Sequence, residues 1–105
     1  MELKPLASAI ITVRKTSRGV RLWQEGPNLA LSGLTRYTPY TREVIGESVI
    51  FTVSPDAKLR VAGKTKPDGS DQPIIDFSAK SINGFVVGDQ LQATYYAGRI
   101  ELVKI

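Results

Sequence analysis

Short stretches of alternating apolar and polar residues run along most of the chain and predict β-strands. Residues 20–25 (VRLWQE) and 89–96 (DQLQATYY) alternate in this way, and residues 8–13 (SAIITV) are rich in β-branched side chains. Both patterns are typical of half-buried strands. The same reasoning predicts further strands over residues 40–45, 47–53, 58–63, 73–77 and 99–105. No segment sustains a helical period over about eleven residues, so the pattern predicts a mainly β protein.

Three segments between these strands predict turns or loops. Residues 26–34 (GPNLALSGL) predict a short helical turn, with Pro27 near its start and Asn28 as its N-cap. Residues 78–84 (SAKSING) predict a second helical turn. Residues 64–72 (KTKPDGSDQ) carry no aliphatic or aromatic side chain, so we expect an exposed, mobile loop there.

The order of the predicted elements repeats along the chain. Residues 8–53 and 58–105 each contain a strand, a short turn and a hairpin, and residues 54–57 join them; Gly46 and Gly98 lie in corresponding hairpins. One such unit is too small to bury its own apolar face, so two units predict a small β-barrel in a single domain. The alternative is that every small β protein alternates strands with glycine turns, and that the similarity has no further meaning.

Composition removes several classes of chemistry. The chain of 105 residues has no cysteine and no histidine, which excludes disulfides, thiolate metal sites and the commonest general base. Asp76 and Asp89 are expected as turn or cap acids, so the sequence predicts no enzyme, no metal site and no cofactor. Residues 6–13 form the longest apolar run and are too short to span a bilayer. Without a signal-peptide pattern at the start, we expect a cytoplasmic protein.

Positive charge is concentrated in the first half of the chain. The net charge is +4, and residues 1–45 contain seven basic and three acidic side chains, whereas residues 46–105 contain seven of each. This asymmetry favours a partner with negative charge that binds the first half.

The densest basic segment predicts a binding site for a polyanion. Arg14, Lys15, Arg18 and Arg21 lie within eight residues with no acid among them. With a loop at residues 16–19, Arg14 lies opposite Arg21, and this repulsion is relieved by an anion between them. A nucleic-acid backbone fits, because a β-ribbon can enter the major groove.

Trp23 follows this basic segment and has two interpretations. Beside the arginines its ring could stack on a base or cover a guanidinium. In the alternative interpretation the cations only solvate an exposed hairpin, and Trp23 belongs to the core.

Further candidate contacts lie outside this segment. Arg36, Tyr37 and Arg42 combine arginines with an aromatic ring, which suits nucleic-acid binding. Lys64 and Lys66 could add phosphate contacts from the polar loop, or be part of a solvated connection.

The last quarter of the chain resembles a known family. Residues 82–103 (INGFVVGDQLQATYYAGRIELV) resemble a unit of the AbrB/SpoVT swapped-hairpin family, particularly its SymE-like branch. The residues that carry this resemblance are Gly84, Phe85, Gly88 and Asp89 in the turn, and Gly98, Ile100 and Leu102 in the hairpin. Residues 20–34 resemble a second unit, but residues 35–40 (TRYTPY) stand where the family has its Gly-Asp pair.

The resemblance implies two interleaved hairpin units in one barrel, often completed as a homodimer, and DNA binding by transcription factors or antitoxins. We therefore expect a small DNA-binding regulator of phage or bacterial type, monomeric or homodimeric, that prefers DNA to RNA. Two alternatives stay open: an inhibitor or adaptor that docks on an acidic host protein, and a SymE-like toxin.

Overall fold

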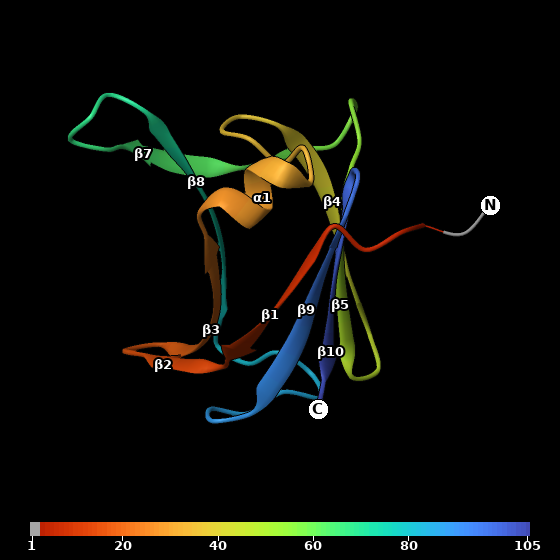
Figure 1. Cartoon of the computed structure of the whole chain (residues 1–105). Coiled ribbons are helices and arrows are strands. Elements are labelled where there is room, and N and C mark those ends of the chain that lie inside the picture. Colours follow the sequence, from red (N-terminus) through yellow and green to blue (C-terminus); the bar gives the residue numbers. More distant parts are fainter. Residues whose placement is uncertain (1–2) are drawn as a thin grey trace.

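The computed structural model describes residues 3–105, which form ten strands and one short helix (Figure 1). The strands are β1 (Ala7–Thr12), β2 (Arg14–Thr16), β3 (Gly19–Glu25), β4 (Pro39–Ile45), β5 (Ser48–Val53), β6 (Leu59–Arg60), β7 (Ala62–Thr65), β8 (Asp71–Ala79), β9 (Gln90–Tyr96) and β10 (Arg99–Lys104). The helix α1 (Pro27–Leu31) lies between β3 and β4. The predicted all-β class is confirmed.

The strands form two antiparallel sheets rather than the closed barrel that we expected. Sheet A has the order β1-β9-β10-β5-β4-β6, and sheet B has the order β2-β3-β8-β7. The barrel prediction is wrong because the edge strands bend: β1 leads through Val13 into β2, and β6 leads through Val61 into β7. Each bend moves the chain to the other sheet and interrupts the ladder.

The core draws apolar side chains from both sheets. Leu22 and Ile75 face inward from sheet B, and Phe51 and Leu102 face inward from sheet A; all four are buried. Figure 1 shows α1 in the upper part of the space between the sheets, where Leu29 is fully buried. The alternation in β3 and β9 therefore places the side chains as the sequence predicts.

Both sheets have an approximate two-fold pattern. If β1–β5 are relabelled as β6–β10 and the reverse, each sheet keeps its strand order, read from the opposite edge. The pair of β1 and β9 therefore corresponds to the pair of β6 and β4. The bends also correspond, because the amide of Val13 donates to the carbonyl of Asp89 at 2.8 Å and that of Val61 donates to Thr38 at 3.0 Å. We interpret the chain as two half-units around this axis.

This correspondence pairs Tyr37 with Gly88. The amide of Tyr37 donates to the carbonyl of Val61 at 2.8 Å, and the amide of Gly88 donates to the carbonyl of Val13 at 3.0 Å. Their φ angles are 74° and 96°. The first half-unit therefore makes the same turn without the Gly-Asp pair.

Several predicted boundaries are wrong because strands pair with distant partners. The loop expected at residues 16–19 is shorter, because Thr16 and Gly19 pair in β2 and β3. The predicted strand over residues 58–63 is broken at Val61. The loop expected at residues 64–72 is shorter, because Lys64 and Thr65 pair with Gln72 and Asp71.

The predictions for the two helical turns differ in outcome. The turn at residues 26–34 contains α1, but its N-cap is Gly26, at φ 99°, rather than Asn28. This position suits Pro27, which has no amide hydrogen to pair and begins the helix. No helix forms at residues 78–84, because β8 continues to Ala79 and an isolated bridge follows.

Asp89 is a turn acid, as expected. Its Oδ2 accepts the amide hydrogen of Val86 at 2.9 Å and lies 3.2 Å from Nζ of Lys104. The amide hydrogen bond, followed by Lys104, holds the pKa of Asp89 below its usual value. A carboxylate with a lowered folded-state pKa stabilises the fold above its unfolded pKa of about 3.9, and this contribution is lost as pH falls through the folded pKa.

We expect Asp89→Asn to lower stability at neutral pH and to weaken the loss of stability below about pH 4. The amide keeps an oxygen for Val86 and removes the charge opposite Lys104. Urea unfolding at a series of pH values measures this dependence. Some acid sensitivity should persist, because hydrogen bonds from Ser70 also lower the pKa of Asp68. A variant with the acid response of the unmodified protein would contradict the prediction.

Candidate nucleic-acid interface

The basic segment forms a tight hairpin at one end of sheet B. Arg14 pairs with Arg21 in the register of β2 and β3, as predicted, but the loop has two residues, Ser17 and Arg18, rather than four. The amide of Arg18 donates to Oγ1 of Thr16 at 3.2 Å, which closes the turn.

The hairpin and the end of β8 border a surface hollow of about 700 Å³. The lining residues are Thr16, Ser17, Arg18, Arg21, Ser78, Ala79 and Lys80. Three cations and three hydroxyl groups therefore surround this space. Guanidinium, ammonium and hydroxyl groups are the side-chain donors that most often contact phosphate oxygens.

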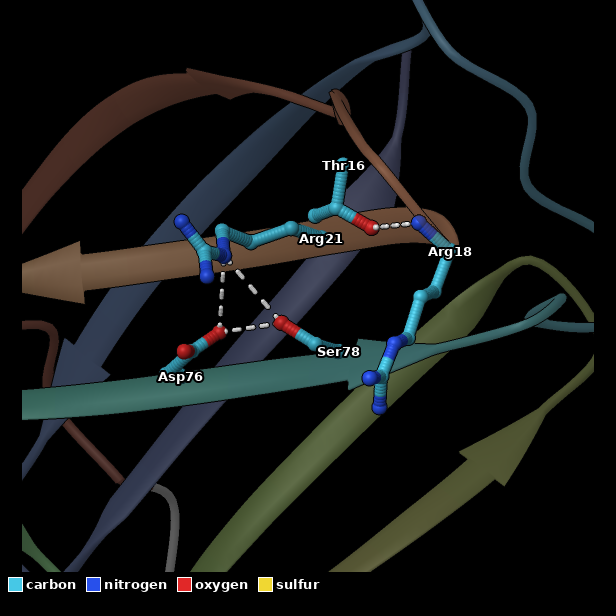
Figure 2. Close-up of polar contacts among 5 residues, drawn as sticks. All are labelled: Thr16, Arg18, Arg21, Asp76 and Ser78. Atoms are coloured by element: carbon cyan, nitrogen blue, oxygen red, sulfur yellow. Dashed lines mark hydrogen bonds and ion pairs between the residues drawn. The ribbon is translucent and has the colours of Figure 1, made fainter.

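Arg21 has a counter-ion within the protein. Its Nε lies 3.2 Å from Oδ1 of Asp76 and donates to Oγ of Ser78 at 3.1 Å, while Ser78 donates to Asp76 at 2.5 Å (Figure 2). Asp76 is therefore a strand residue in an ion pair, not the turn or cap acid that the sequence suggested. Only Nε donates a hydrogen bond: none from the two terminal nitrogens of Arg21 is found within residues 3–105.

Trp23 lies on the outer face of sheet B, so its assignment to the core is wrong. It alternates with the buried Leu22 and Gln24, and the side chain is half-buried. The guanidinium carbon of Arg21 lies 5.2 Å from the centre of its ring. Trp23 therefore covers a guanidinium, one of the two roles that the sequence suggested for it.

The remaining cations of this end are exposed and unpaired. Arg14, Lys15, Arg18 and Lys80 make no ion pair with any residue in the described range of 3–105. Figure 2 shows the Arg18 side chain reaching past the end of β8. The hairpin and the adjoining end of β8 thus present five cations, of which one is paired.

Sequence reasoning missed Lys80 and Ser78. Both approach the hairpin only because β3 pairs with β8, with Val20 opposite Ala79. No local pattern indicates a contact over nearly sixty residues of sequence. The repeated order of elements was the relevant signal in the sequence, because a two-fold arrangement can place equivalent strands, here β3 and β8, side by side.

The other candidate residues do not join this surface. Arg36 pairs with Asp71 at 3.2 Å, at the opposite end of β8 from Ser78. Seven residue-to-residue steps along the strand separate Asp71 from Ser78, or about 23 Å. Figure 1 shows the β2–β3 and β7–β8 hairpins at opposite ends of sheet B. Tyr37, Lys64 and Lys66 belong to the far end.

Arg42, an exposed residue of β4, reaches from sheet A to Phe77 of sheet B. Its guanidinium carbon is 3.8 Å from the centre of the Phe77 ring, and Phe77 faces the core from β8. Arg42 therefore covers an apolar ring at the margin of the core and is not part of the basic hairpin.

Comparisons with models of protein families, with curated proteins and with solved structures found no match to this chain. Residues 3–105 contain no group of three acidic side chains arranged to hold a metal ion. No helix within the described part of the chain is long and apolar enough to cross a membrane.

Proposed function

We propose that the protein binds nucleic acid through the cationic surface formed by the β2–β3 hairpin and the end of β8. The observation that carries the proposal is a contrast between two equivalent hairpins. By the two-fold pattern, β7–β8 corresponds to β2–β3. The β7–β8 hairpin carries two cations, Lys64 and Lys66, and two acids, Asp68 and Asp71, so it has no excess of positive charge. This position in the fold therefore does not itself require an excess of cations.

The placement of the charges supports a phosphate backbone as the ligand. Arg14 and Arg21 are direct cross-strand neighbours, an arrangement that destabilises a β pair. Asp76 forms an ion pair with Arg21 only, so Arg14 has no counter-ion within residues 3–105. A phosphate in the hollow would contact Arg18 and Lys80, and a second phosphate at the β2 edge would contact Arg14.

The form of this function that we propose is a cytoplasmic DNA-binding regulator of AbrB-like type. The resemblance of residues 82–103 to the swapped-hairpin family supports this form, and a two-stranded ribbon has the dimensions to enter the major groove of DNA. An acidic protein surface is the competing ligand, since it would meet the same cations.

The double variant Arg14→Ala with Arg18→Ala is expected to bind duplex DNA at least about tenfold more weakly at about 0.1 M salt. The slope of log affinity against log salt should fall by nearly two, because each phosphate that is no longer neutralised lowers it by about 0.9. Folding should not suffer, because Arg14→Ala removes a like-charge pair. Fluorescence anisotropy over a salt series measures both quantities.

The matched control is Lys4→Ala with Lys58→Ala, which removes the same charge from two exposed positions outside the hairpin. An equal loss in the control would show that total charge, not the hairpin, determines binding, and would overturn the proposal. Absence of binding by the unmodified protein would do the same. A stable complex with an acidic protein would then favour the adaptor alternative.

A further inference from the structure

Tyr37 holds a backbone conformation that its side chain disfavours. It is the one non-glycine residue in the range 3–105 with positive φ, at 74°, and its counterpart is Gly88. For a bulky residue this region is a genuine outlier, and such strain persists where another requirement imposes it. Core packing is not that requirement, because Tyr37 is 67% exposed.

The structure also fixes a guanidinium against the Tyr37 ring. The guanidinium carbon of Arg36 lies 5.1 Å from the ring centre, and Nη1 is held by Asp71 at 3.2 Å. Gly63 leaves room for the arginine stem, since a Cβ there would lie 3.0 Å from Cγ and Cδ of Arg36. Arg36 thus covers one face of the Tyr37 ring, while most of Tyr37 is exposed to solvent.

We infer that Tyr37 is a stacking platform for an unpaired base of a single-stranded nucleic acid. A second cation would be disfavoured on this ring, because Arg36 already occupies its favourable position. A flat, uncharged base gains stacking energy on such a ring whatever its identity. Bases in a duplex are covered by their neighbours, so the ligand is single-stranded or locally open.

This inference rests on the function proposed above, because it takes the ligand to be a nucleic acid. It adds a second site beside Asp71, at the end of sheet B opposite the basic hairpin. A strand bound to both would meet phosphate contacts at one end of the sheet and a stacked base at the other.

Tyr37→Gly tests the platform without damage to the fold, because glycine is the residue at the equivalent position. The probe is a fluorescein-labelled oligo-thymidine of about twelve nucleotides, within the range of single-strand site sizes. We expect an affinity loss of about tenfold for this strand and none for a duplex of equal length. Tyr37→Phe should bind as the unmodified protein does, and the melting temperature of Tyr37→Gly should be unchanged or higher.

Each other outcome overturns a defined claim. If Tyr37→Gly keeps full affinity for the single strand, or if Tyr37→Phe loses it, the platform is refuted. If Arg14→Ala with Arg18→Ala loses affinity for both probes while Tyr37→Gly does not, the hairpin proposal stands alone. If only Tyr37→Gly loses affinity, the platform stands and the hairpin proposal fails. If the unmodified protein binds neither probe, both fail.

Discussion

Replacing Gly19 by alanine is expected to destabilise the protein by about 3 kcal/mol and to displace the cationic hairpin. Gly19 begins β3 and lies against the end of β8. A Cβ there would be 2.2 Å from the carbonyl oxygen of Ala79 and 2.5 Å from that of Lys80. Both obstacles are backbone atoms, so no side-chain rotation makes room. The hairpin must move away from β8, which separates Arg21 from Ser78.

The equivalent hairpin supplies the control for this prediction. Gly69 lies in the β7–β8 loop at φ 88°, and nothing lies within 4 Å of a Cβ built there. Gly69→Ala should therefore cost only about 1 kcal/mol, from the unfavourable backbone conformation alone. Urea unfolding followed by circular dichroism measures both variants. Equal destabilisation by Gly19→Ala and Gly69→Ala would show that contact with β8 is not what requires glycine at residue 19.

The local sequence pattern predicts individual strands well, because alternation follows from which face of a strand is buried. In β3, Leu22 turns inward and Arg21 turns outward, as the pattern VRLWQE indicates. The pairing of Arg14 with Arg21 also follows from local sequence, since the hairpin turn determines it.

Features that depend on distant segments were not predictable in this way. Asp76 reaches Arg21 only through the pairing of β3 with β8. The bends at Val13 and Val61 have no local signal, because a buried valine fits a continuous strand equally well. The positive φ of Tyr37 contradicts residue preference, so sequence alone predicts a different conformation there. The fold class could be predicted, whereas the arrangement of the sheets and the counter-ions could not.

Phe51→Ala is expected to lower the free energy of unfolding by about 3–5 kcal/mol. Phe51 is fully buried on β5, in the middle of sheet A, and its ring centre lies 5.9 Å from that of Tyr40 in a tilted arrangement. Truncation leaves a cavity that the backbone cannot close, because β5 is hydrogen-bonded to β10 on one side and to β4 on the other. It also removes the aromatic contact, worth about 1 kcal/mol.

The two-fold pattern provides a graded variant in case Phe51→Ala does not fold. The counterpart of Phe51 is Leu102, also fully buried, so Phe51→Leu places the counterpart's residue in the same layer. Its cost should be about 1 kcal/mol, since leucine refills most of the volume. Val103→Ala, on the outer face of the neighbouring strand, should change stability by less than about 0.5 kcal/mol. If Phe51→Ala cost no more than Val103→Ala in urea unfolding, the two sheets would not share the core described above, because the side chain at its centre would then be dispensable.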